Sequence, residues 1–150
     1  DELKLRNNKD DIYVYAGDEM KIVIPKIMSE KPSEEDLELL AKIIHVEAGH
    51  EGIEGRIAVG NVVLNRVNDS RFPDTIRDVI YQPNQFPPAT DGLLDAADPD
   101  ERTYEAALRV LQGEMVAEGA LYFYNPKRTT ASFFTSREVV IELGNHRFVK

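Results

Sequence analysis

The sequence predicts an α+β fold in which helices come first along the chain and a small antiparallel sheet follows. Apolar residues recur at helical spacing between residues 33 and 113, whereas strand-forming runs occupy 120–126, 139–143 and 146–149. The pair Gly144-Asn145 between the last two runs is typical of a hairpin turn. A chain of 150 residues with 42% hydrophobic content can form one domain with one core.

The first 32 residues have a different pattern from the rest. A charged stretch is followed by two β-rich runs, Ile12–Tyr15 and Lys21–Pro25, on either side of Gly17-Asp18. We therefore expect a small hairpin or arm over residues 1–32 and a main domain over residues 33–150.

A first helix is predicted to begin at Ser33, because acidic residues follow it where a capping box places them. It should end near Gly49, a residue suited to a left-handed C-cap. A second helix over about 52–67 is apolar around most of its circumference, which indicates a buried central helix, and Gly60 would allow close approach.

Three further segments are expected between residues 73 and 113. A short helix should follow Pro73-Asp74-Thr75, and the proline-rich residues 82–88 predict an irregular loop. A further helix is expected with Asp98 as its cap and Pro99 in its first turn, ending by Gly113.

The composition excludes several classes of function. A net charge of -9 disfavours sequence-blind binding to nucleic acid or to an anionic membrane, and no apolar run approaches the ~20 residues that a spanning helix needs. The absence of cysteine removes disulfides and thiolate chemistry. Because the chain begins at Asp1 without a basic-then-apolar signal, we expect a processed or truncated form from which any targeting segment has been lost.

Glu47 is the sharpest candidate for catalysis. It shares a helix face with Leu40, Ile43 and Ile44, so its carboxyl projects from the apolar side of the first helix. Partial burial and the negative end of the helix dipole would both raise its pKa, which keeps a general acid protonated near neutral pH. The alternative is that Glu47 caps a loop or pairs with Arg56 or Arg66.

No metal site is predicted. His45 and His50 are five residues apart, whereas a zincin pair needs histidines at i and i+4. The aspartates between Asp91 and Asp100 lack EF-hand spacing, so a solvated acidic loop is the better interpretation. Nucleophile-elbow, P-loop and dinucleotide motifs do not occur either.

The segment around Glu47 is followed along the chain by further short motifs. The first set runs from Leu40 to Glu51 and from Val59 to Arg66, and the second comprises Phe72-Pro73, Val79-Ile80, Gln85-Phe86, Ala120–Pro126 and Gly144–Phe148. In order and spacing these motifs resemble the spore cortex-lytic enzyme and cell-wall hydrolase family over residues 37–150. The sequence departs from that family's pattern at Glu47–Glu51, where Gly49-His50 replaces Arg-Gly, and at Phe133–Arg137, where a tryptophan is missing.

The resemblance implies a lysozyme-like or lytic-transglycosylase-like domain that cleaves the β-1,4 bond between N-acetylmuramic acid and N-acetylglucosamine. It implies no cofactor. Glu47 would be the catalytic acid and then the base, and Glu51 would polarise it, hold a second bond or act as a second carboxylate. The expected groove residues are Gln85, Phe86, Tyr122, Tyr124 and Asn125, since aromatic faces beside an amide suit a sugar chain. His146 is expected to order the hairpin beside the groove.

Two other functions stay open at this point. One is a muramidase that uses water on the same bond, and the other is a non-catalytic glycan-binding or germination module. The expected partner is a peptidoglycan glycan strand, with no nucleic acid and no membrane insertion, and the expected location is the cell wall, the spore or the secreted fraction. A regulatory protein is plausible for a wall enzyme, but no residue encodes one.

Overall fold

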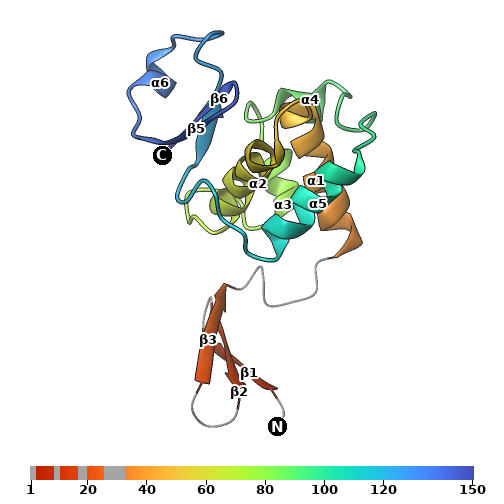
Figure 1. Ribbon diagram of the computed structural model, residues 1–150, viewed down its shortest axis with the longest axis vertical. Helices are drawn as coiled ribbons and strands as arrows, with labels where there is room; N and C mark the ends of the chain where they lie inside the picture. The colour runs from red at the N-terminus through yellow and green to blue at the C-terminus, as the bar shows by residue number, and fades with distance from the viewer. Residues whose placement is uncertain (1–2, 9–10, 17–19, 26–32) are drawn as a thin grey trace. The chain divides into compact units, whose positions relative to one another are not determined.

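The computed structural model describes residues 3–8, 11–16, 20–25 and 33–150, and the chain divides into two compact units, 1–32 and 33–150 (Figure 1). The first unit holds three antiparallel strands in the order β1-β2-β3: β1 Leu3–Asn8, β2 Asp11–Ala16 and β3 Met20–Pro25. Strand β1 lies in the charged stretch at the start of the chain, where the sequence analysis predicted no strand. The expected turn at Gly17-Asp18 lies outside the described residues.

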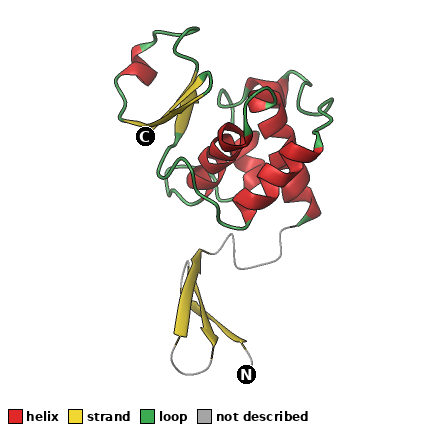
Figure 2. Cartoon of the chain, viewed as in Figure 1, coloured by secondary structure: helices red, strands yellow, loops and turns green. Residues whose placement is uncertain are grey.

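Three helices form the core of the second unit (Figure 2): α1 Glu34–Ala48, α2 Ile53–Val67 and α5 Glu101–Leu111. Helix α2 is buried over eleven of its fifteen residues, so the prediction of a buried central helix is confirmed. A Cβ atom on Gly60 would lie 2.8 Å from a methyl of Val110 and 3.0 Å from a methyl of Ile44. Glycine at this position therefore lets α2 approach both neighbouring helices.

Helix boundaries differ from the predictions in three places. Gly49 is right-handed, with φ -61°, and glycine is needed there because a Cβ would lie 2.5 Å from the carbonyl oxygen of His45. The side chain that caps α5 is Asp100 rather than Asp98, accepting a bond of 2.8 Å from the N–H of Thr103. The loop at 82–88 ends in a helical turn, α4 Pro87–Thr90, since proline is tolerated in the first turn of a helix. The short helix expected after Pro73-Asp74-Thr75 is present as α3, Ile76–Ile80, and its N-cap is Thr75.

The sheet of the second unit has the strand order β4-β6-β5 and is antiparallel throughout. Its strands are β4 Tyr122–Tyr124, β5 Val139–Leu143 and β6 His146–Val149, and a short helix that the sequence did not predict, α6 Ser132–Thr135, precedes β5. The α+β class is thus confirmed. Figure 1 shows β5, β6 and α6 gathered beside the helices. We call residues 33–118 the helical lobe and residues 119–150 the sheet lobe.

Candidate active site

Glu47 lies in the last turn of α1, where the sequence predicted it. The helix begins at Ser33, whose hydroxyl accepts a bond of 3.0 Å from the N–H of Asp36, and it ends at Ala48. Leu40, Ile43 and Ile44 are fully buried, which fixes the rotation of the helix against the core. Because Glu47 follows one turn later on that face, its carboxyl is half-buried rather than free in solvent.

The surroundings of Glu47 favour the protonated form of its carboxyl. Burial raises its pKa above the usual range. Among the described residues it has neither a hydrogen bond nor an ion pair, and its oxygens are not among the buried atoms that lack a partner. An acid that is partly desolvated and yet reachable can donate a proton.

The alternative pairing of Glu47 with an arginine is not observed. Arg56 donates from Nη2 to the carbonyl of Gly49 at 2.6 Å and lies 3.6 Å from Asp100. Arg66 donates from Nε to the carbonyl of Leu121 at 2.8 Å. Both buried guanidinium groups are therefore engaged elsewhere.

Glu51 joins the α1–α2 connection to the turn between β5 and β6. Its Oε1 accepts a bond of 3.1 Å from the N–H of Asn145 and lies 3.6 Å from Nδ1 of His146. Gly144 has φ +56°, and a Cβ on it would overlap the Glu51 carboxylate. The carboxylate thus occupies space that only a glycine at the turn leaves open.

His146 is held on the inner face of the sheet. Its ring meets Phe123 edge-on at 5.2 Å and Phe148 at 6.2 Å. Burial lowers the pKa of His146, and the nearby Glu51 carboxylate offsets only part of that effect. The lowered pKa favours the neutral imidazole, and the ring contacts with Phe123 and Phe148 are consistent with the expectation that His146 orders the hairpin by packing.

Two of the expected groove residues are buried, and this corrects the prediction for them. Phe86 is 4% exposed and packs against Phe123 and the guanidinium of Arg66. Tyr124 is 5% exposed, stacks on Phe134 at 5.2 Å and accepts a bond from Arg147 at its hydroxyl. Neither ring has a free face for a sugar, so both rings are part of the protein core rather than of a glycan-binding surface. The aromatic pattern alone could not separate these roles.

Tyr122 lies on the sheet face opposite Phe123, because strand side chains alternate. Its half-buried ring contacts Phe72 and Phe133, with the guanidinium of Arg137 4.2 Å from the ring centre. His146 and Tyr122 therefore do not share a surface. Tyr122 and Tyr124 lie on one face of the sheet, and Phe123 and His146 lie on the other.

Gln85 and Asn125 are both half-buried residues of loops. The N–H of Gln85 donates to the carbonyl of Gln82 at 3.3 Å, and no side-chain partner is found for it among the described residues. The Oδ1 of Asn125 accepts a bond of 2.9 Å from the N–H of Lys127, which closes a turn after β4. The amide NH2 groups of both residues remain able to donate to a ligand. Among the described residues, no three His, Asp or Glu side chains are arranged to hold a metal ion.

Three polar residues of α2 bind the segment that leads from α5 into the sheet lobe, a role that the sequence analysis did not give them. Asn61 is fully buried, and it accepts bonds from the N–H groups of Val116 and Ala117 and donates to the carbonyl of Glu114. Asn65 donates to the carbonyls of Ala117 and Ala120 at 3.1 and 2.9 Å.

Arg66, which binds Leu121 as described above, also lies 5.1 Å from the ring centres of Phe72, Phe86 and Tyr122. Burial lowers its pKa to about 10. The signal in the sequence was the occurrence of polar residues at i, i+4 and i+5 within an otherwise apolar helix.

A protein-family model described as Cell Wall Hydrolase matches residues 50–149. The matched span begins three residues after Glu47 and includes Glu51 and residues 119–149 of the sheet lobe. Two curated relatives are similar in sequence. A spore cortex-lytic enzyme of Oceanobacillus iheyensis is 36% identical over 118 residues, 79% of this chain and 42% of that protein. The cell wall hydrolase CwlJ of Bacillus subtilis is 32% identical over 120 residues, 75% of this chain and 83% of that protein.

A solved structure has the same fold. The catalytic domain of a germination-specific lytic transglycosylase, SleB from Bacillus anthracis, superposes with a TM-score of 0.74 at 31% identity, covering 81% of this chain and 98% of that one. The chain spans less than half the length of the spore cortex-lytic enzyme quoted above. In the described part of the chain, no helix has the length and apolar character needed to cross a membrane. The matched span and the shared fold together show that the chain belongs to the cell wall hydrolase family.

Proposed function

We propose that this chain cleaves the β-1,4 bond between N-acetylmuramic acid and N-acetylglucosamine in peptidoglycan by lytic transglycosylation, with Glu47 as acid and then base. The observation that carries the proposal is the Glu47 carboxyl itself. It is half-buried at the end of α1, has a raised pKa and has no partner among the described residues. The name of the structural neighbour, a lytic transglycosylase, supports the same chemistry.

One carboxyl is sufficient for this reaction. Protonated Glu47 donates its proton to the glycosidic oxygen as the bond from that oxygen to C1 of the muramyl residue breaks. The resulting carboxylate then takes the proton of the muramyl 6-hydroxyl, whose oxygen bonds to C1. The products are a 1,6-anhydro-muramyl end and a free 4-hydroxyl, so no water is consumed and Glu47 is again protonated.

The contacts of Glu51 support this mechanism over a hydrolase with two carboxylates. A retaining or inverting glycosidase uses a second carboxylate on the sugar or on a water. The Oε1 of Glu51 instead accepts from the N–H of Asn145, and the side chain is only 12% exposed beside His146. We assign Glu51 the role of holding the β5–β6 turn beside α1, with Gln85 and Asn125 as amide donors to the glycan.

The names of the relatives support a place of action in the cell wall or the spore. The curated relatives are named as spore cortex-lytic enzymes and as cell wall hydrolases. We propose peptidoglycan glycan strands as the partner of this chain. Its substrate would then meet the enzyme outside the cytoplasmic membrane.

The test is mass spectrometry of the fragments released from purified cortex and vegetative peptidoglycan. The native chain is expected to release anhydro-muramyl products, and Glu47→Gln is expected to release none, because the amide cannot donate the proton. Glu54→Gln is the matched control, since Glu54 is an exposed acid in the first turn of α2. It should release the same products as the native chain.

Other outcomes would overturn parts of the proposal. Products with reducing muramyl ends would show that the enzyme is a hydrolase. Glu51 would then again be the candidate for the second carboxylate. Binding to the wall without any product would replace the enzyme by a glycan-binding module. Unchanged products from Glu47→Gln would remove Glu47 from the mechanism.

A further inference from the structure

A buried guanidinium group lies where the three core helices meet, and the proposed reaction does not use it. The group belongs to Arg56, in the first turn of α2, and the Arg56 side chain is only 8% exposed. Helix α1 packs against both α2 and α5. Because a buried cation is costly unless other groups bind it, the partners of Arg56 indicate what it does at this place.

Arg56 binds the end of the helix that carries Glu47. Its Nη2 donates to the carbonyl of Gly49 at 2.6 Å. Gly49 is the C-cap residue of α1 and lies two residues after Glu47. The carbonyl groups at the end of a helix lack partners within the helix, and a positive charge is favoured there. Arg56 therefore gives this end of α1 both a donor and a charge.

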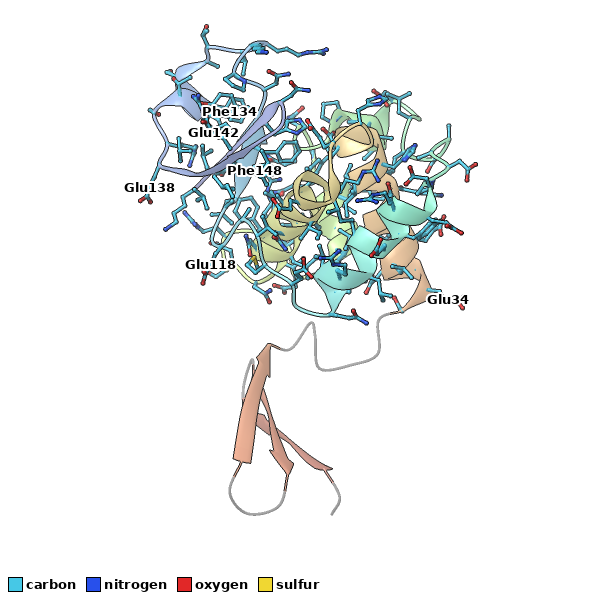
Figure 3. The ribbon with its side chains drawn as sticks, viewed as in Figure 1. Glu34, Glu118, Phe134, Glu138, Glu142 and Phe148 are labelled. Carbon is cyan, nitrogen blue, oxygen red and sulfur yellow. The ribbon has the colours of Figure 1, made fainter. Side chains whose placement is uncertain are left out.

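Arg56 also meets the start of α5. Its Nη1 lies 3.6 Å from Oδ1 of Asp100, which caps α5 by accepting a bond from the N–H of Thr103. The Asp100 side chain is 54% exposed, so solvent screens this ion pair, and the bond to Gly49 is the stronger contact. Figure 3 shows Glu34, at the opposite end of α1, on the outer edge of the helices. Arg56 thus holds the end of α1 that carries the acid.

The segment that Arg56 holds lies between the two acids, Glu47 and Glu51. Residues 49–52 connect α1 to α2. Among the described residues, two side-chain hydrogen bonds hold this connection: the bond from Arg56, and the bond from the N–H of Asn145 to the Glu51 carboxylate. The second bond comes from the sheet lobe. Because helix ends fray, the last turn of α1 depends on Arg56 for its attachment to the helical lobe.

We propose that Arg56 is a positioning residue for Glu47. Its bond to Gly49 holds the last turn of α1 so that the Glu47 carboxyl meets the glycosidic oxygen in the reactive geometry. The proposal rests on the proposed function for the reaction. Arg56 is buried between helices and does not touch the glycan, so its loss slows the chemical step and leaves substrate binding intact.

The kinetic test compares Arg56→Met with Arg56→Lys on soluble peptidoglycan oligosaccharides. Methionine keeps the apolar stem without the donor, whereas lysine keeps the charge and can donate to the carbonyl of Gly49. Arg56→Met is expected to lower kcat about 10- to 100-fold with KM unchanged, and Arg56→Lys should restore most of the kcat. Arg77→Met is the matched control, because Arg77 is an exposed arginine of α3 that pairs with Glu35. It should have the kcat of the native chain.

Hydrogen exchange measured by NMR tests the same contact without turnover. The N–H groups of Gly49 and Glu51, which donate to the last turn of α1, should exchange about tenfold faster in Arg56→Met, relative to the N–H groups in the middle of α1. Arg66→Met is the control for a general loss of stability, since Arg66 is also buried but lies at the other end of α2. It should leave this ratio of exchange rates unchanged.

Arg56→Gln is the second variant, because a neutral amide is easier to bury and its shorter side chain does not reach Gly49. It should show the same loss of kcat, measured at a temperature where circular dichroism shows the variant to be folded. Unchanged kcat in both variants, a raised KM at unchanged kcat, or unchanged exchange at Gly49 and Glu51 would overturn the proposal. If the native chain itself releases no product, the proposed function fails, and the exchange rates still decide whether Arg56 holds the end of α1.

Discussion

In the helical lobe most buried side chains are aliphatic, whereas the sheet lobe has few buried side chains and is held mainly by ring contacts, guanidinium groups and a few specific hydrogen bonds. Leu40, Ile43 and Ile57 are fully buried in the first. In residues 119–150 the buried side chains are only Ala120, Leu121, Tyr124, Phe148 and Val149. The helical lobe therefore has the larger share of the stability, and the sheet lobe is positioned by polar contacts with α2 and Glu51. A change in those contacts can therefore shift the sheet lobe relative to Glu47 without unfolding the helices.

The largest expected effect on stability is in the aliphatic core. Ile57→Ala removes a fully buried side chain of α2 and leaves a cavity, so the free energy of unfolding should fall by about 2–5 kcal/mol. Leu108→Ala, at a residue that is 40% exposed, should cost about 0.5 kcal/mol or less. Urea denaturation measures both. Equal losses would show that the core does not dominate the stability.

The next effect concerns the polar contacts between α2 and the segment that follows α5. Asn61→Ala leaves the N–H groups of Val116 and Ala117 and the carbonyl of Glu114 without their partner, at a cost of about 1–3 kcal/mol. Gln112→Ala, on the exposed end of α5, is the control. Near-UV circular dichroism should report the loss, because Tyr122, Tyr124 and the six phenylalanines lie in the sheet lobe or contact it. An unchanged denaturation midpoint would contradict the role given to Asn61.

Gly144→Ala tests the contact between Glu51 and the hairpin turn. The new methyl adds strain at φ +56° and overlaps the Glu51 carboxylate, so we expect a loss of about 1–2 kcal/mol and reduced product release. Gly92→Ala is the control, because it adds backbone strain without an overlap: φ is +89° and no atom lies within 4 Å of the added Cβ.

The Glu51 contact can be isolated in a double mutant. Glu51→Ala combined with Gly144→Ala should cost less than the sum of the two single changes, because the overlap is then absent. Strict additivity would mean that the carboxylate does not define the turn.

The smallest expected effect is the dependence of stability on pH at Glu47. Its pKa is raised in the folded protein, so the folded state binds more protons than the unfolded state above the ordinary pKa of a glutamate. The stabilisation that the Glu47 carboxyl contributes is complete below the ordinary pKa of a glutamate. It is lost as the pH rises through the higher pKa that Glu47 has in the folded protein. Glu47→Gln should therefore raise the melting temperature at pH 7 and leave it unchanged at pH 4. Glu54→Gln should have no such effect, and an equal gain at both pH values would contradict the assignment.

Much of the helical lobe was predictable because each helix has its own signals. The cap at Ser33 and the apolar face through Ile44 determine α1 locally, and Gly60 marks the close approach of α2. The missed features depend on competition between neighbours. Asp98 and Asp100 are both good caps, and only the packing of α5 selects Asp100. The four-residue helix α6 has too few residues to show a period.

The candidate site was predictable in part. That Glu47 lies on the apolar face of the last turn follows from spacing alone. Whether Phe86 and Tyr124 meet a ligand or the core does not, because an aromatic residue in a strand or loop has the same pattern in both cases. Glu47 lacks an arginine partner because Arg56 binds Gly49 and lies near Asp100, and Arg66 binds Leu121. The sequence does not reveal these contacts.

The sequence by itself determined the α+β class, the buried α2, the end of α1 at the candidate acid and the family, because periodicity, caps and motif order are properties of neighbouring residues. Only the tertiary structure decided that Glu51 holds the β5–β6 turn, that Arg66 connects the lobes and that Arg56 binds the end of α1. These contacts join residues that are far apart in the sequence. Their free energies depend on burial and distance, which no local pattern encodes.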